Sequence, residues 1–218
     1  MLTRQEAQAF YDRFGAKQDQ QGFYEDVATR DLIAHADFAG AHAVFEFGCG
    51  TGRFAAQLLG PILRQNATYV GCDVSTTMVG LARERLARFG ERVRVVQSDG
   101  SMRLDAVDGT IDRFVSNYVL DLLSPDDIID LISEVRRVLT PAGRLCLVSL
   151  AHGPTVLSGF VSWAWARLHR MRPSLVGGCR PINLREFLSD SQWDVAYRNV
   201  VVAFGIPSEV VVARKRDG

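Results

Sequence analysis

One stretch, Val44 to Gly52, constrains the fold of this chain more than any other. It reads Val-Phe-Glu-Phe-Gly-Cys-Gly-Thr-Gly, an apolar run broken by one acid and followed by glycines at alternate positions. The apolar run predicts a buried strand, and the glycines predict a tight turn that a Cβ atom would obstruct. Apolar residues at helical spacing then predict a helix over residues 51–64. Open α/β sheets bind small ligands at such a junction of strand and helix.

The spacing of the glycines separates the ligand classes that use such a turn. A dinucleotide fingerprint has glycine at the first, third and sixth positions. Counted from Gly48, these positions hold Gly48, Gly50 and Arg53. The long arginine disfavours a nicotinamide-dependent dehydrogenase, which stays an alternative. No Gly-Lys-Ser or Gly-Lys-Thr closes the loop, and this excludes a Walker-type phosphate site.

Two further acids follow predicted strands. The stretch Thr68 to Asp73 predicts a second strand that ends in an acid, and Ser75 after it predicts a helix cap. An acid at this place can accept hydrogen bonds from both ribose hydroxyls, as an adenosine-bearing cofactor requires. Residues 92–97 predict a third strand, and Asp99 comes shortly after it.

An acid two residues before a Gly-x-Gly-x-Gly turn resembles motif I of the class I S-adenosylmethionine (SAM)-dependent methyltransferases, and the later acids follow in the same order. The resemblance implies SAM as the cofactor and S-adenosylhomocysteine (SAH) as its product. It also implies that Asp99 accepts a hydrogen bond from the adenine amino group. The cofactor-binding residues carried over in this way are Glu46, Gly48, Cys49, Gly50, Gly52, Asp73, Val74, Met78, Asp99, Gly100 and Asn117.

Other segments resemble the same family. The stretch 138–145 is similar to its Leu-x-Pro-Gly-Gly segment, and Asp112 matches the acid that opens its fourth strand. The run 11–14 and the two final strands resemble the ubiquinone-biosynthesis-type, or methyltransferase type 11, small-molecule group. The resemblance implies an N-terminal helical cap over residues 1–40. No Asn-Pro-Pro-Tyr follows the fourth strand, which argues against a macromolecular nitrogen as acceptor.

The order of the elements predicts the fold class. Strands alternate with helices as far as Leu150, and residues 193–203 and 209–214 predict a closing hairpin. The prediction is a Rossmann-like α/β fold of the class I methyltransferase type, with a seven-stranded sheet that is parallel except for its antiparallel final hairpin and helices on both faces. Residues 1–218 are expected to form one domain, with a helical insertion on the substrate side over 151–190.

The composition of the chain limits the kinds of partner that the protein is expected to bind. The 218 residues carry 25 basic and 25 acidic side chains, so no nucleic-acid partner is expected. The N-terminus lacks an apolar signal core, and no run approaches the ~20 apolar residues that span a bilayer. The scattered cysteines lack metal-site spacing, which predicts reduced thiols in a soluble, cytoplasmic protein without a metal. These cysteines are Cys49, Cys72, Cys146 and Cys179.

The sequence does not settle the acceptor. The sulfonium of SAM is already activated, so the protein mainly has to position a nucleophile, and it needs a general base only if the acceptor must lose a proton. The candidates are Tyr11, Tyr118, Asp121 and His152. The expected acceptor is a small, partly apolar molecule that reacts through oxygen, sulfur, nitrogen or carbon, in a protein that is a monomer or homodimer.

Two alternatives stay open. Apolar and aromatic residues recur at helical spacing over 157–168, and basic residues follow as far as Arg172. This segment predicts an ordinary amphipathic helix, a wall of the substrate pocket, or peripheral membrane contact through residues 156–172. Membrane contact would suit a lipid- or quinone-directed methyltransferase. The absence of an evident base also permits a non-catalytic SAM-binding protein.

Overall fold

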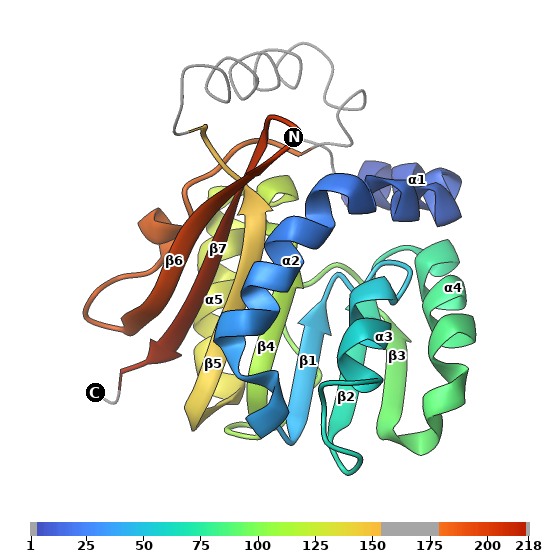
Figure 1. The fold of residues 1–218 in the computed structure, drawn as a ribbon, viewed down its shortest axis with the longest axis horizontal. Coiled ribbons are helices and arrows are strands. Elements are labelled where there is room, and N and C mark those ends of the chain that lie inside the picture. The colour runs from blue at the N-terminus through green and yellow to red at the C-terminus, as the bar shows by residue number, and fades with distance from the viewer. Residues whose placement is uncertain (1–3, 154–178, 217–218) are drawn as a thin grey trace.

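The computed structural model describes residues 4–153 and 179–216, and within these ranges it shows a seven-stranded sheet with helices on both faces (Figure 1). The strand order is β3-β2-β1-β4-β5-β7-β6. The first five strands in the chain pair in parallel, and β7 is antiparallel to both of its neighbours. The predicted fold class is therefore confirmed. The strands are β1 (Ala43–Phe47), β2 (Thr68–Asp73), β3 (Val93–Gln97), β4 (Ile111–Asn117), β5 (Leu139–Leu150), β6 (Trp193–Ala203) and β7 (Ile206–Lys215).

The helices connect the parallel strands and cover the sheet. In Figure 1, α2 and α3 lie in front of the sheet and α5 lies behind it. The α-helices are α1 (Arg4–Phe14), α2 (Gly22–Ala36), α3 (Arg53–Leu59), α4 (Thr76–Leu86) and α5 (Pro125–Val138). The shorter 3₁₀ helices are η1 (Gly15–Gln21), η2 (Phe38–Gly40), η3 (Ala87–Arg92), η4 (Leu120–Leu122) and η6 (Leu184–Phe187).

The core forms two layers because alternate side chains of a strand face opposite sides of the sheet. In β7, Val210 packs in the same cluster as Leu32 of α2 and Leu58 of α3, whereas Val211 packs in the cluster that contains Leu131 of α5. All five side chains are buried. The buried runs of β5 and β7 therefore hold helices against both faces.

Local sequence explains where two helices begin. The hydroxyl of Ser75 accepts a hydrogen bond from the backbone N–H of Met78 at 3.1 Å, and α4 starts there as predicted. The hydroxyl of Ser124 likewise accepts from the N–H of Asp127 at 3.1 Å, and Pro125 occupies the first turn of α5. These are ordinary N-cap contacts, which satisfy amides that the helix itself leaves unpaired.

Some predicted boundaries are wrong. The helix predicted over 51–64 ends at Leu59, and β5 begins at Leu139 instead of Arg144. Leu139 pairs with Ile111 and Arg144 pairs with Arg113, so residues 140–143 bulge out of β5 without forming a separate turn before it. The last strand begins at Ile206, earlier than predicted, because Phe204 and Gly205 form the hairpin turn with positive φ.

The N-terminal segment, residues 4–21, differs from the rest of the chain in its packing. It comprises α1 and η1, and none of the residues 5–21 is buried. By contrast, α2 contributes six buried residues. In Figure 1, α1 lies at the edge of the sheet toward which β1 points. The segment therefore lies at the carboxyl ends of the parallel strands without adding a side chain of residues 5–21 to the core.

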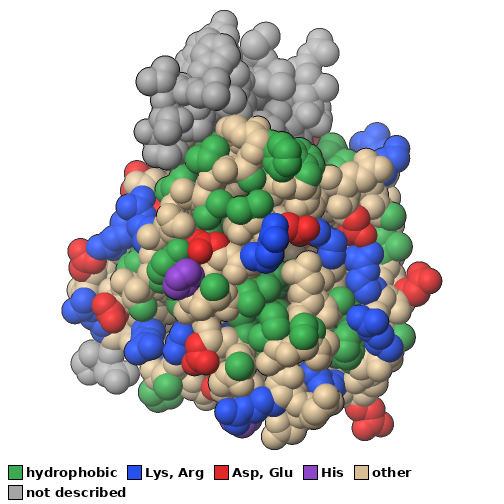
Figure 2. Space-filling view, viewed as in Figure 1, with side chains coloured by type: hydrophobic (Ala, Val, Ile, Leu, Met, Phe, Trp, Pro, Cys, Tyr) green, Lys and Arg blue, Asp and Glu red, His purple; other side chains and the backbone are tan. Residues whose placement is uncertain are grey.

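Two further observations bear on partners. Figure 2 shows Lys and Arg side chains mixed with Asp and Glu over the face that carries α2 and α3. Of the helices in the described ranges, none is both long and apolar enough to cross a membrane. The predicted helix over 157–168 and the predicted membrane contact of residues 156–172 lie outside the described residues.

Candidate functional site

In the glycine turn after β1, the backbone lies very close to residues at the end of β2 and after β4. Gly48 has a φ of +78°, and a Cβ atom on it would lie 2.3 Å from Cγ2 of Val119. The backbone N–H groups of Gly48 and Cys49 both donate to the carbonyl oxygen of Cys72, at 2.8 and 2.9 Å. The turn thus passes tightly between the ends of β2 and β4. No larger residue fits at Gly48 without a shift of its surroundings.

Asp73 connects this turn to the end of β2. One carboxylate oxygen accepts from the N–H of Gly50 at 2.9 Å, and the other accepts from the N–H of Ser75 at 2.9 Å. Burial raises the pKa of Asp73, while the hydrogen bonds from these two amides oppose the rise. The carboxylate borders a cavity and still has lone pairs for a further donor.

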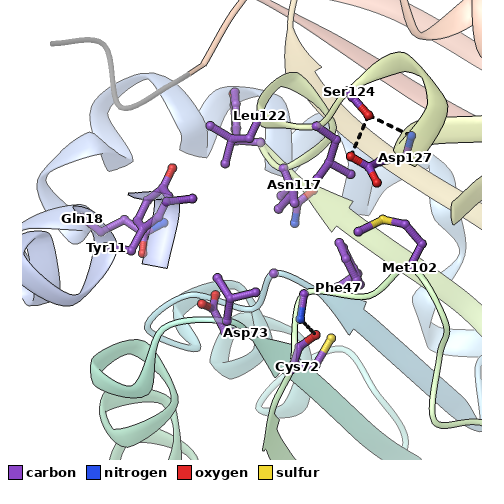
Figure 3. A pocket seen from close by; sticks show the side chains of 18 residues that line it. Tyr11, Gln18, Phe47, Cys72, Asp73, Met102, Asn117, Leu122, Ser124 and Asp127 are labelled. Atoms are coloured by element: carbon purple, nitrogen blue, oxygen red, sulfur yellow. Dashed lines mark hydrogen bonds between the residues drawn. The ribbon is translucent and has the colours of Figure 1, made fainter. Parts of the chain in front are cut away.

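The cavity that Asp73 borders is the larger of two adjoining cavities. It lies at the carboxyl ends of β1, β2 and β4. Figure 3 shows Tyr11 and Gln18 on one side, Asn117 and Leu122 on the other, and Asp73 between them. Much of the remaining wall is apolar, from residues that include Phe47, Met102, Val119 and Leu123. Of the residues predicted from the sequence, Tyr11, Gly48, Asp73, Val74, Gly100, Asn117 and Tyr118 line this cavity.

A smaller cavity adjoins the larger one and differs from it in charge. Its walls include the carboxyl groups of Asp19, Glu25, Asp26 and Glu46, and the guanidinium of Arg53. Arg53 donates to Glu25 at 3.1 Å and to Asp26. Four residues line both cavities: Gln18, Gly48, Asn117 and Tyr118. The two cavities therefore meet beside the glycine turn.

Glu46, the acid before the glycines, is buried at this junction. The hydroxyl of Tyr69 donates to its carboxylate at 2.6 Å. Burial raises the pKa of Glu46 to about 8, and the contact with Tyr69 opposes the rise. Asn117 lies nearby and also opposes the rise in the pKa of Glu46, although its amide oxygen and nitrogen are buried and neither makes a hydrogen bond of normal length. Buried polar atoms in proteins are nearly always paired, so this amide is suited to a bound polar group.

The other predicted cofactor residues occupy different places. Cys49 and Gly50 line the smaller cavity, whereas Met78 belongs to the first turn of α4 and is fully buried. Gly52 precedes α3 with a φ of +73°. Asp99 borders neither cavity, because its carboxylate turns back to accept from the N–H of Ser101 at 2.8 Å. Its neighbours Ser98 and Gly100 face the larger cavity instead.

The candidate bases also differ in position. Tyr11 and Tyr118 line the larger cavity, and burial raises the pKa of both phenols well above the usual value, so they act as hydrogen-bond donors at neutral pH. Tyr118 shares a 2.8 Å hydrogen bond with Ser208. Asp121 is fully buried, accepts from the N–H of Leu150 at 3.2 Å, and has its pKa raised by burial to about 7. His152 is exposed and lines neither cavity.

Sequence reasoning missed several cavity residues. Phe47 and Cys72 adjoin predicted site residues, so their place next to the motif was a usable signal. Met102 lies two residues after the predicted Gly100, whereas Gln18 and Asp127 come from distant segments and carried no such signal. Across residues 4–153 and 179–216, no three His, Cys, Asp or Glu side chains are grouped so that they could hold a metal ion.

Comparison with known proteins agrees with this geometry. Residues 44–143 match the family model described as a methyltransferase domain. Methyltransferase GfsG of Streptomyces halstedii is 30% identical over 148 residues, which cover 64% of this chain and 51% of the relative. A carboxy-S-adenosyl-L-methionine synthase of Chromohalobacter salexigens is 34% identical over 136 residues, with coverage of 58% and 46%. The ubiquinone/menaquinone biosynthesis C-methyltransferase UbiE of Desulfotalea psychrophila is 30% identical over 135 residues, with coverage of 62% and 52%.

These relatives are longer than the matched region, and the chain spans about half of their length. Among solved structures, YcgJ of Bacillus subtilis superposes with a TM-score of 0.67 at 20% identity, and the match covers 88% of this chain and all of that one. That likeness establishes the fold. Together with the match over residues 44–143, it makes this chain similar in sequence and in fold to the class I SAM-dependent methyltransferases, the family that the glycine turn predicts.

Proposed function

We propose that this protein binds SAM across the two joined cavities and transfers its methyl group to a small, partly apolar acceptor. The observation that carries the proposal is the glycine turn at their junction, with the buried, unpaired amide of Asn117 beside it. The family match supports it, since the matched residues 44–143 supply this turn, Asp73 and Asn117.

The residues at the junction fit the chemical parts of SAM. The carboxylate of Asp73 would accept from the ribose hydroxyls. The turn at Gly48 and Gly50 lets the backbone approach the ligand closely. When bound, SAM supplies a methyl group that its sulfonium has already activated.

The chain's own residues then have a limited task. Phe47, Met102 and Leu122 provide apolar walls that exclude water, and the phenols of Tyr11 and Tyr118 are donors that can orient an acceptor. A base is required only for an acceptor that must lose a proton. Asp121 has a pKa near neutrality, which suits a base better than either phenol does. It is fully buried and lines neither cavity, however, so a proton would have to reach it through a neighbouring group. A catalytic role for His152 stays a prediction.

The relatives support two classes of acceptor. UbiE is named as a C-methyltransferase of ubiquinone and menaquinone biosynthesis, and this favours a quinone-type or lipid-like acceptor. The apolar walls of the larger cavity are compatible with such an acceptor. Methyltransferase GfsG supports methyl transfer without indicating the acceptor. Flotation with liposomes tests the proposed membrane contact, and size-exclusion chromatography with light scattering tests whether the protein is a monomer or homodimer.

The first experiment is calorimetric titration of the purified protein with SAM and with SAH. The proposal expects both to bind, and NADH, as the control, not to bind. A second experiment incubates the protein with SAM labelled in the methyl group and a panel of thiols, phenols, quinols and aminolipids. Failure of both SAM and SAH to bind would contradict the proposal. Binding without turnover of any acceptor would favour a SAM-binding protein without catalysis.

A second candidate function comes from the carboxy-S-adenosyl-L-methionine synthase relative, which is 34% identical to this chain. In such a reaction SAM itself would be modified, and no methyl group would reach an acceptor. Mass spectrometry of the nucleoside products separates the two candidates. Methyl transfer yields SAH, whereas the synthase reaction, which needs an added carboxyl donor, yields carboxy-S-adenosyl-L-methionine. Conversion to SAH that depends on an added acceptor would exclude the synthase candidate.

A further inference from the structure

Three arginines lie side by side near the amino ends of the parallel strands, at the end of the sheet opposite α1 (Figure 1). Arg113 of β4 pairs in register with Arg144 of β5, and Arg144 pairs in register with Arg214 of β7. Register partners on neighbouring strands project from the same face of a sheet, so the three side chains form one row across it. Like charges in directly opposite positions destabilise a sheet, and the row therefore requires negative charge beside it.

Two of the three arginines have a structural role at the end of α2. Arg113 is buried and donates to the carbonyl oxygens of Ala36 and Asp37, both at 2.7 Å. Arg113 and Arg144 also share one carboxylate oxygen of Asp37, at 3.1 and 2.9 Å. One carboxylate carries a single negative charge, so this pair of guanidinium groups keeps a net positive charge.

Arg214 adds a third cation without an acid of its own. It is exposed, and it makes no hydrogen bond or ion pair with any residue in the ranges 4–153 and 179–216. Its register partner on β6 is Asp194, but the carboxylate of Asp194 pairs with Arg216 at 3.9 Å. The guanidinium of Arg214 is therefore available to a ligand.

The row lines an open cavity of about 850 Å³, which shares no residue with the two cavities of the candidate site. Small-molecule sites have volumes of roughly 300–1,000 Å³. The walls carry five basic side chains and three acidic ones. The basic residues are the three arginines with Lys215 and Arg216, and the acidic residues are Asp37, Asp112 and Asp194. This excess of positive charge attracts an anion.

We propose that this cavity binds a phosphoryl group, held by the guanidinium groups of Arg214 and Arg144. The planar guanidinium donates pairs of N–H bonds that match the oxygens of a phosphate. A phosphoryl group carries a charge of about −2, which offsets the excess charge of the walls. The group belongs either to a soluble phosphorylated molecule or to a lipid headgroup. Because the site lies at the other end of the sheet from the cavities proposed for SAM, the inference is independent of the proposed function.

The test is calorimetric titration of the wild type and three variants with inorganic pyrophosphate. We expect Arg214→Gln to bind it about 10-fold or more weakly, because a hydrogen bond between charged groups is lost. Arg88→Gln, the matched control, should bind like the wild type, since Arg88 is an exposed arginine outside all three cavities. Asp194→Asn should bind about two- to fivefold more tightly, because an acid beside the anion is neutralised. A damaged fold does not produce tighter binding.

Flotation with vesicles of phosphatidylcholine, with and without phosphatidic acid, distinguishes the two sources of the phosphoryl group. Flotation that requires phosphatidic acid and is lost in Arg214→Gln would assign the group to a lipid, whereas binding of pyrophosphate without flotation would assign it to a soluble molecule. Absence of both would overturn the inference. Equal weakening in Arg214→Gln and Arg88→Gln would also overturn it, because it would reduce the binding to general charge attraction.

Competition with SAH checks where the anion binds. Pyrophosphate should bind with the same affinity when SAH is present, and its displacement by SAH would place it in the cavities of the candidate site and overturn the inference. Failure of SAH itself to bind would contradict the proposed function and leave the pyrophosphate results unaffected. Thermal unfolding of each variant without ligand checks that the fold is intact.

Discussion

The carboxylate of Asp73 accepts a hydrogen bond from the backbone N–H of Gly50 over 2.9 Å, so the last residue of β2 holds the glycine turn that follows β1. The second carboxylate oxygen holds the N–H of Ser75 at the start of α4. Asp73 therefore fixes two turns and also faces the larger cavity. One side chain thus combines a structural role with a place in the cavity that we propose to bind SAM.

Replacement of Asp73 should reveal both roles. Asp73→Ala is expected to weaken SAH binding by about 1.5 to 3 kcal/mol, or 10- to 150-fold, because hydrogen bonds to an ionised carboxylate are lost. Its unfolding temperature should also fall, since two backbone amides lose their acceptor. Calorimetric titration and thermal unfolding measure the two effects, with Asp130→Ala on the exposed side of α5 as the control. Unchanged SAH affinity in Asp73→Ala would remove Asp73 from the cofactor site.

Two glycine substitutions should act in opposite directions. Gly48→Ala places a methyl group 2.3 Å from Val119 at a positive φ, so we expect a loss of about 2 kcal/mol or more in the free energy of unfolding, and weakened SAH binding. Gly80→Ala, within α4, meets nothing within 4 Å and should stabilise the protein by about 0.5 to 1 kcal/mol. Urea unfolding of both variants measures the difference. Equal stability of the two would contradict the strained geometry of the turn.

The stability of the protein should depend on pH through Asp121. Burial raises the pKa of Asp121 from 3.8 to about 7, so the folded state binds this proton more tightly than the unfolded state does. The resulting stabilisation is complete below pH about 4 and is lost as the pH rises through about 7. Between pH 5 and pH 8, the free energy of unfolding should therefore fall by up to about 2.5 kcal/mol more in the wild type than in Asp121→Asn.

Urea unfolding of both proteins at pH 5 and pH 8 tests this expectation. Burial also raises the pKa of Glu25 to about 7 and that of Glu46 to about 8, but both groups are present in each protein, so the comparison isolates Asp121. An identical pH dependence in the two proteins would show that Asp121 keeps an ordinary pKa. It would then lose its advantage over the phenols as a candidate base.

The N-terminal segment should open more readily when its polar contacts are removed. Asp19→Ala deletes the acceptor for Thr51 and Arg85, so we expect faster hydrogen exchange across residues 4–21 and unchanged exchange in α2. The unfolding temperature should change little. Asp31→Ala serves as the control, because Asp31 accepts from the hydroxyl of Tyr197, far from the segment. Exchange of residues 4–21 at the wild-type rate in Asp19→Ala would assign the docking of the segment to other contacts.

Those parts of the fold that are determined by a few adjacent residues could be predicted from the sequence. The strand before Gly48, the cap at Ser75 and the cap at Ser124 each follow from a few adjacent residues, and the structure has them at the expected places. The bulge over 140–143 was not predictable, because Pro141 and Gly143 suggest a turn and only the pairing with β4 shows that β5 continues through them. A register shift depends on the partner strand, which local sequence does not contain.

The candidate site also divides into residues that local sequence predicts and residues that depend on distant contacts. Gly48, Gly50 and Asp73 lie in turns whose geometry their own residue types determine, and they meet at the cavities. Gln18 reaches the site through contacts with distant turns, so no local pattern indicated it. Asp99 follows β3 as predicted, yet its carboxylate bonds to Ser101 and its neighbours face the larger cavity. Which side chain of a short loop points inward depends on backbone direction, which the residue types leave open.

Residues 5–21 contain no buried residue, whereas the adjoining α2 contains six. This difference separates a part of the chain that tolerates substitution from a part that does not. Residues 5–21 carry Tyr11 and Gln18, which line the larger cavity, but the core does not depend on them. Changes there can alter the choice of ligand at little cost to folding, whereas the same number of changes in α2 would disturb packing. An engineer who wants a different ligand preference from this scaffold should therefore build a library in residues 5–21 first and leave Gly22 and the residues after it untouched.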